Sequence, residues 1–147
     1  YKRQRALLSM RLEKGWGVWT MEYRPDFNAV ESGMDVFINW KKDFIGKEAT
    51  LTARNEGVSQ KLLTMVIDTD GIDVVHDEAI LKDGTPVGYV SSGGYAHHVG
   101  QSMAMGYVAT EFAAPGTTLQ VEILGRLYDA EVLSGPIYDA NGVYMRS

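Results

Sequence analysis

Two segments of the sequence concentrate side chains that could bind or transform a small molecule. Residues 15–32 place Glu22 between Trp19 and Tyr23, in a stretch that has neither the period of a helix nor that of a strand. Residues 91–100 hold two serines, three glycines, a tyrosine and two histidines. Aromatic rings and a polar anchor can hold a flat ligand, which makes the first segment a candidate binding loop. The second segment either approaches a ligand or another domain closely, or merely turns the chain.

Metal and serine-nucleophile chemistry have no support in the spacing of the reactive side chains. His97 and His98 are adjacent, so on a strand they would face opposite sides and could not chelate one metal ion together. Ser102 stands in a near match to the Gly-x-Ser-x-Gly nucleophile motif, which ends here in Ala104. We therefore expect no metal site.

The composition narrows the class of protein. The 147 residues carry 14 basic and 19 acidic side chains and a formal net charge of −5, the opposite of the basic charge that sequence-independent nucleic-acid binding needs. The absence of cysteine excludes a disulfide framework, a thiolate zinc site and a cysteine nucleophile. No apolar run reaches the roughly 18–20 residues that cross a bilayer. We expect no nucleic-acid or membrane partner, and a cytoplasmic location.

The chain is expected to open on a helix. Strong helix formers with apolar positions three or four apart predict a helix over residues 4–14, which Gly15 would stop. Glu13 and Lys14 at its end are expected to be solvated charges. The sequence starts at Tyr1 and enters the helix without an N-cap signal, so we expect a piece of a longer polypeptide.

Two further elements are predicted before the β-rich part. A β-branched and aromatic run predicts a strand over residues 34–40. Helix-forming composition over residues 45–55 predicts a second helix, with Asp43 as a cap and Gly57 as its stop.

Short strands separated by turn signals fill the rest of the chain. Asp83-Gly84 and Gly125-Arg126 predict tight hairpin turns, because glycine accepts the positive φ that such turns demand. The six predicted strands cover residues 62–67, 79–82, 87–91, 103–108, 118–124 and 127–133. Antiparallel strands at this spacing predict a small closed barrel or a sandwich. The expected fold class is mainly β with helices (α+β): a helical and loop segment, residues 1–56, followed by an antiparallel β-barrel of about six strands, residues 57–147.

Several short motifs occur in an order that resembles a known family. They are SMRLEKG at residues 9–15, WTME at 19–22, ESGM at 31–34, DFIGKEA at 43–49, VGYVSSGG at 87–94, AMGYV at 104–108 and PIYD at 136–139. Together they resemble the C-terminal part of the glycine-cleavage T-protein (aminomethyltransferase) family. The first helix and the residue 91–100 segment look most like the folate-binding modules of dimethylglycine and sarcosine dehydrogenases, ranked above a free-standing T-protein. Demethylases of dimethylsulfoniopropionate share the fold and remain an alternative.

The resemblance implies a function for the whole module. Tetrahydrofolate would accept a one-carbon unit from an amine-derived donor, and FAD would belong to a possible upstream domain. The partners of this chain would be the missing N-terminal part of the same polypeptide, the folate and the amine substrate. The family's catalytic aspartate lies upstream of Tyr1, so we expect the chain alone to be inactive.

The resemblance also implies the residues at the edge of the folate site. T-proteins hold the glutamate tail of folate with an arginine at the position of Leu7, so we expect the tail to be bound differently here. Arg146, Lys2 and Arg5 could bind the tail or simply be solvated surface cations. The predicted folate-binding residues are Trp19, Glu22, Tyr95, His97, His98, Tyr144 and Arg146.

A non-catalytic role is the second hypothesis. The barrel would then be a lid or docking module that contacts the rest of the protein through residues 91–100. An exposed apolar patch larger than a few hundred Å² on the helical side is expected for a severed module.

Overall fold

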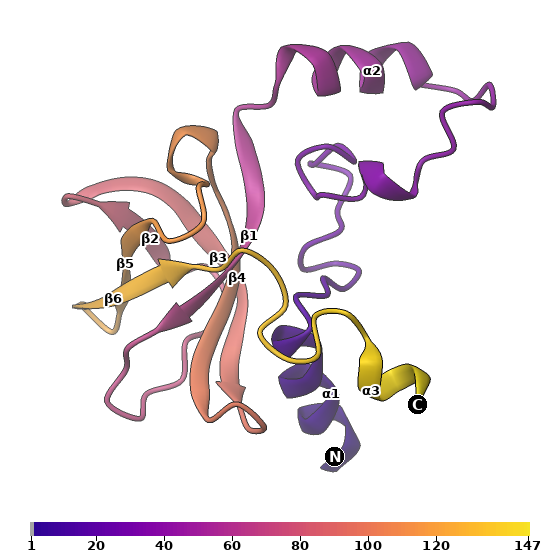
Figure 1. The fold of residues 1–147 in the computed structure, drawn as a ribbon. Helices are drawn as coiled ribbons and strands as arrows, with labels where there is room; N and C mark the ends of the chain where they lie inside the picture. The colour runs from indigo at the N-terminus through magenta and orange to yellow at the C-terminus, as the bar shows by residue number, and fades with distance from the viewer. Residues whose placement is uncertain (1) are drawn as a thin grey trace.

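An N-terminal helix, an irregular arm with a second helix, a six-stranded barrel and a short C-terminal helix follow one another along the chain (Figure 1). The computed structural model describes the backbone of residues 2–147 and the side chains of Arg3 and residues 5–147. The elements are α1 (Lys2–Glu13), η1 (Asp35–Phe37), α2 (Lys47–Glu56), β1 (Gln60–Ile67), β2 (Ala79–Lys82), β3 (Thr85–Ala96), β4 (Gln101–Ala109), η2 (Thr110–Phe112), β5 (Thr118–Ile123), β6 (Arg126–Val132) and α3 (Val143–Arg146).

The six strands close into one antiparallel barrel. Their order around the barrel is β1-β4-β3-β2-β5-β6. The barrel closes because β1 pairs with β4 along its whole length and with β6 at its end, where Met65 lies opposite Val132. This architecture confirms the predicted fold class, and each of the six predicted strands is present.

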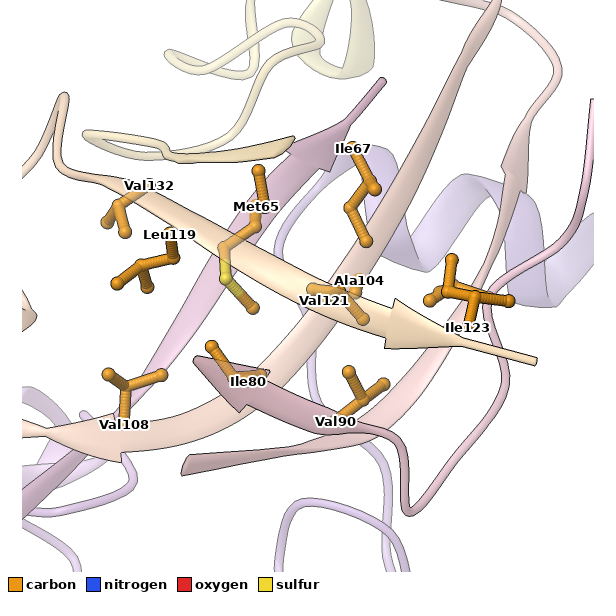
Figure 2. Packing of buried hydrophobic residues seen from close by; sticks show 12 residues of the cluster. Met65, Ile67, Ile80, Val90, Ala104, Val108, Leu119, Val121, Ile123 and Val132 are labelled. Carbon is orange, nitrogen blue, oxygen red and sulfur yellow. The ribbon is translucent and has the colours of Figure 1, made fainter. Parts of the chain in front are cut away.

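Alternating apolar side chains fill the inside of the barrel (Figure 2). Leu119, Val121 and Ile123 of β5 and Ala130 and Val132 of β6 are all at most 2% exposed. Burying a side chain of this size contributes about 1.5–3 kcal/mol. The period of two in the sequence therefore identified the inner face of this hairpin correctly.

A second, smaller cluster joins α1 to the outer wall of the barrel. It contains Leu12 of α1 with Ala96, Met103 and Met105 of β3 and β4. β4 is buried on both faces, because its inward residues fill the barrel, while α1 covers its outward Met103 and Met105 and Phe27 covers its outward Tyr107. This packing places the end of α1 over β3 and β4. The division of the chain into residues 1–56 and 57–147 stays a prediction.

Both predicted hairpin turns are present and contain glycine, but the second lies one residue earlier than predicted. Asp83 and Gly84 have φ values of 50° and 77°, as a type I′ turn requires. The second turn uses Leu124 and Gly125, with φ values of 50° and 76°, rather than Gly125 and Arg126. Arg126 is already the first residue of β6.

The predicted strand over residues 34–40 is wrong. The chain forms η1 there, and the following helix α2 begins at Lys47. A closed barrel has no free edge to which another strand could pair, so this apolar run has no ladder to join. Asp43 is not the cap of α2 either; Gly46 holds that position, and Asp43 instead accepts a hydrogen bond from Lys47 at 3.2 Å.

The predicted loop over residues 91–100 is mostly strand. β3 runs to Ala96, and the chain turns only over residues 97–100. Gly93 serves close packing rather than a turn, because a Cβ there would lie 1.8 Å from Cγ1 of Val74.

The arm that carries η1 and α2 stands apart from the barrel (Figure 1). Neither element buries a residue among the described side chains. Val36 and Phe37 are 76% and 79% exposed, and Ile45 is fully exposed. Across residues 2–147, no helix is both long and apolar enough to cross a membrane.

Candidate functional site

A largely apolar groove of about 390 Å³ lies beside the C-terminal end of α1. Three stretches far apart in the sequence form it: α1 with the residues after it, the β3–β4 turn, and the residues after β6, 133–147, which we call the C-terminal segment. Its lining residues are Leu7, Met10, Arg11, Glu13, Lys14, Trp16, His98, Tyr138 and Met145. Figure 1 shows the C-terminal segment and α3 beside α1.

Main-chain and charged contacts hold the C-terminal segment against the end of α1. The carbonyl oxygen of Glu13 accepts hydrogen bonds from the amides of Ile137 (3.1 Å) and Tyr138 (3.2 Å). The Lys14 ammonium donates to the carbonyl of Asp139 and lies 3.6 Å from its Oδ2. The segment is thus anchored at one end of the groove.

The Asp139 carboxylate organises the start of α3. Its Oδ1 accepts hydrogen bonds from the amides of Val143 (2.7 Å) and Tyr144 (3.3 Å). Desolvation raises the pKa of this carboxyl, but the hydrogen bonds from Tyr144 and Val143 and the Lys14 charge outweigh it and leave the pKa below its ordinary value.

The aromatic rings of His98 and Tyr138 line the groove, and Tyr144 extends the row beyond it. His98 packs on Tyr138 with ring centroids 4.2 Å apart, and Tyr138 stacks on Tyr144 at 6.3 Å. The amide of His98 donates to Oε1 of Glu13 at 2.8 Å. Of the predicted site residues, His98 therefore lines the groove, and Tyr144 contacts it through Tyr138. Arg146 borders an adjoining hollow of about 280 Å³.

Tyr95 and His97 lie at a different hollow. It has a volume of about 220 Å³ and is lined by Arg5, Asp73 and α1. The two rings meet edge to face at 5.1 Å, and the His97 amide donates to Oγ of Ser9 at 2.8 Å. The two adjacent histidines thus serve different hollows, and the side chain of Lys2, a predicted cation, lies outside the described residues.

The other two predicted residues, Trp19 and Glu22, have opposite surroundings. Trp19 is 80% exposed, and its ring lies edge to face with that of Tyr23, with ring centroids 6.3 Å apart. Glu22 is completely buried and forms an ion pair with Arg11 at 3.2 Å. The structure therefore gives Glu22 no exposed surface at the groove.

Glu13 and Lys14 are not the solvated charges that the sequence predicted. Glu13 is 2% exposed, and the Lys14 side chain is 13% exposed. The C-terminal segment covers both, and a contact between residues more than 120 positions apart leaves no trace in the local pattern around residue 13.

All the groove-lining residues except His98 were missed as site residues, and Trp16, Tyr138 and Met145 are three of them. Trp16 and Met145 are exposed by 56% and 65%, and Tyr138 links His98 to Tyr144. Trp16 belongs to the aromatic loop that the sequence singled out, so its residue type was a usable signal. Within the part of the chain that the structure describes, no group of three or more metal-ligating side chains is present.

A comparison with models of known protein families shows to which family this chain belongs. The model for the "Glycine cleavage T-protein C-terminal barrel domain" matches residues 60–139, more than half of the chain. This chain belongs to that family. The matched region runs from β1 to Asp139 and so contains the whole barrel and the first part of the C-terminal segment, without α3. The resemblance drawn from the sequence motifs is confirmed.

Other members of the glycine cleavage T-protein family share most of the chain. Mitochondrial dimethylglycine dehydrogenase of Mus musculus is 34% identical over 134 residues, covering 90% of this chain and 15% of that protein. The aminomethyltransferase of a Picosynechococcus strain is 32% identical, covering 90% of this chain and 37% of its own length. The chain thus spans only a minor part of these relatives.

A solved T-protein has the same fold. The crystal structure of glycine cleavage system aminomethyltransferase T from Bartonella henselae superposes with a TM-score of 0.86 at 24% identity. The match covers 93% of this chain and 39% of that one. It therefore extends beyond the barrel to most of the remaining residues of this chain.

Proposed function

We propose that this chain is the C-terminal part of a tetrahydrofolate-dependent aminomethyltransferase-like module in a protein similar to dimethylglycine dehydrogenase. The observation that carries the proposal is the 34% identity to that dehydrogenase over 90% of the chain. The aminomethyltransferases among its relatives support one-carbon transfer as the reaction class. The role of this chain would be to bind and orient the folate, since the expected catalytic aspartate lies upstream.

The groove beside α1 is the proposed site for the flat part of the folate. Trp16, His98 and Tyr138 offer ring faces to a flat aromatic ligand. Arg146, in the adjoining hollow, supplies positive charge for the glutamate carboxylates. When bound, tetrahydrofolate would supply the nitrogen that accepts the one-carbon unit.

Leu7 supports a changed tail contact. It is one of the groove-lining residues and is 58% exposed, and it stands where the resemblance to T-proteins implies an arginine for the tail. The tail would then run toward Arg146 rather than along α1. The amine donor, an upstream FAD domain and the cytoplasmic location stay predictions.

A titration with tetrahydrofolate tests this proposal. Tryptophan fluorescence and calorimetry would follow binding to the 147-residue chain and to a longer polypeptide with the additional portion that its relatives have. We expect saturable binding, and an increase of about tenfold in Kd for Trp16→Ala. Trp40→Ala is the matched control, because Trp40 lies on the arm beside Arg54 and outside the groove. Failure of both proteins to bind would contradict the proposal.

A docking role without folate contact is the second candidate. The exposed apolar residues Val36, Phe37 and Ile45 favour it, and they lie on the arm rather than in residues 91–100. Binding of the additional portion by the wild-type chain, with loss of that binding in Phe37→Ser and no folate binding by the assembled protein, would support this candidate.

A further inference from the structure

A buried polar cluster lies next to the groove and joins α1 to the residues that follow it. Arg11 and Glu22 are 4% and 0% exposed, and their side chains meet at 3.2 Å. The Glu22 carboxylate also accepts hydrogen bonds from the amide of Val18 (2.9 Å) and from the hydroxyls of Ser91 (2.8 Å) and Ser92. We call Arg11, Glu22, Ser91 and Ser92 the polar latch.

An irregularity in the barrel makes the latch possible. Successive side chains of a regular strand point to opposite faces, so two neighbouring serines should not reach the same carboxylate. The pairing of β3 with β4 shifts register between Val90 and Ser92, which leaves Ser91 as the extra residue of a bulge. Both hydroxyls then face Glu22. Bulges often re-aim side chains in this way beside functional sites.

Polar contacts rather than apolar burial hold residues 15–23, and besides the latch they are backbone hydrogen bonds and the bond from the Tyr107 hydroxyl to the Glu22 carbonyl. Glu22 is the single buried residue of this segment, while Trp16 and Trp19 are 56% and 80% exposed. Thr20 has a φ of 73°, a region that a β-branched residue occupies only when its surroundings impose it. An apolar core therefore does not fix the shape of this segment.

The latch connects directly to the rim of the groove. Arg11 accepts a hydrogen bond on its carbonyl from the Trp16 amide at 2.8 Å, and its Nη1 donates to the Trp16 carbonyl at 3.4 Å. The orientation of Arg11, which Glu22 fixes, thus sets the backbone from which the Trp16 ring reaches the groove.

We infer that Arg11 and Glu22 are positioning residues: the polar latch fixes residues 15–23 and holds Trp16 at the rim of the groove, and Glu22 does not itself touch a ligand. Its effect on folate binding rests on the proposed function, whereas its effect on residues 15–23 does not. Replacing a buried ion pair by apolar residues often preserves stability, so stability and positioning can be measured separately.

The decisive experiment compares two variants of the chain by amide hydrogen exchange and melting temperature. Arg11→Met with Glu22→Met removes both charges, and Arg24→Gln with Asp26→Asn is the matched control, since it removes an exposed ion pair just beyond the segment. We expect exchange in residues 15–23 to rise by about tenfold in the latch variant, with β1 and β4 and the melting temperature little changed. The control should exchange like the wild type.

Two results would overturn the inference. One is wild-type exchange in residues 15–23 of the latch variant; the other is a uniform rise throughout the barrel, which would make the pair a general stabiliser. If the latch variant does not fold, Ser92→Ala decides, because it keeps both charges and removes one donor. Faster exchange confined to residues 15–23 supports positioning, and unchanged exchange refutes it.

A folate titration of the same variants separates this inference from the proposed function. We expect a rise of about tenfold in the Kd for tetrahydrofolate in the latch variant and no change in the control. If the wild-type proteins do not bind folate, the proposed function fails while the exchange result still decides the inference. Binding with unchanged Kd despite a loosened segment would overturn the link between the latch and the groove.

Discussion

Tyr107 is a buried polar side chain in the wall of the barrel that both stacks on a ring and donates a hydrogen bond. It is 1% exposed, stacks on Phe27 with ring centroids 3.6 Å apart, and donates its hydroxyl proton to the carbonyl of Glu22 at 2.9 Å. Burial raises the pKa of this phenol to about 12. A single side chain thus connects the outer wall of β4 to the residue on which the polar latch depends.

The raised pKa of Tyr107 predicts an alkaline loss of stability. The unfolded phenol ionises at its ordinary pKa of 10.0, while the folded phenol keeps its proton up to about 12. The unfolded state therefore binds fewer protons in this range, and the free energy of unfolding falls as pH rises from 10 to 12. Urea unfolding across this range measures the effect. Tyr107→Phe should weaken the pH dependence, and an unchanged slope in that variant would contradict the assignment.

Close backbone contact predicts the cost of a methyl group at Gly88. A Cβ there would lie 2.1 Å from the carbonyl oxygen of Tyr107 on β4, an atom that cannot move without breaking the ladder. We expect Gly88→Ala to lower the free energy of unfolding by about 3 kcal/mol. Gly135→Ala is the control, because no atom lies within 4 Å of its added Cβ, and it should change stability by less than about 0.5 kcal/mol. Equal denaturation midpoints for the two variants would refute the argument.

At the scale of elements, the sequence predicted what periodicity and turn chemistry encode. Apolar and polar residues alternate strictly along β5 and β6, and a glycine turn joins the two strands, so the strands and their inner face were predictable. Residues 34–40 have strand-like composition but no strand to pair with, and pairing is a property of the closed barrel rather than of the local sequence. The bulge at Ser91 is likewise a feature of strand register, which the glycines around it did not reveal.

The site was predictable only where one segment carried it. The aromatic loop and the adjacent histidines were recognisable as unusual in the sequence. Which of their residues would line the groove was not predictable. His98 faces the groove and His97 another hollow because the chain turns between them, and Glu22 lies buried because Arg11 and two serines distant in sequence meet it. Contacts between residues so far apart in the sequence leave no recognisable spacing of residue types.

The C-terminal segment should detach from α1 in acid. The pKa of Asp139 lies below its ordinary value of 3.8, so its contribution is present above that pH and is lost as the pH falls through the lower folded value. Near-UV circular dichroism between pH 2 and 6 reports on Tyr138, Tyr144 and Trp16. Asp139→Asn should abolish this acid transition, whereas Asp77→Asn, at an exposed pair with His76, should leave it in place. An unchanged acid transition in Asp139→Asn would show that protonation of Asp139 does not release the segment.

At the scale of the whole molecule, the chain combines a well-packed barrel with an arm that buries nothing. The arm presents Val36, Phe37 and Ile45 to solvent, and its helix α2 has no buried residue among its described side chains. Apolar side chains gathered on one protruding element typically mark an interaction surface. The relatives, of which this chain spans a minor part, contain further chain that such a surface could contact.

The exposure of the arm predicts a change in surface behaviour without a change in stability. Phe37→Ser with Ile45→Ser should reduce binding of a hydrophobic dye and self-association, while the free energy of unfolding stays within about 0.5 kcal/mol of wild type. Val121→Ser in the barrel core is the contrasting control and should cost several kcal/mol, because it buries a hydroxyl and leaves a cavity. Dye binding that is unaffected by the double substitution would show that the arm is not the apolar surface.

The closure of the barrel between β1 and β6 also determines how the protein can fold as it is synthesised. Val66 must wait for Glu131, its partner across that seam, to leave the ribosome. Until then β1 and β5 are unpaired edges, on which nascent chains can associate with one another. Pairings this distant in sequence slow folding toward the millisecond-to-second range. The nascent chain therefore keeps two exposed strand edges until β6 has been translated.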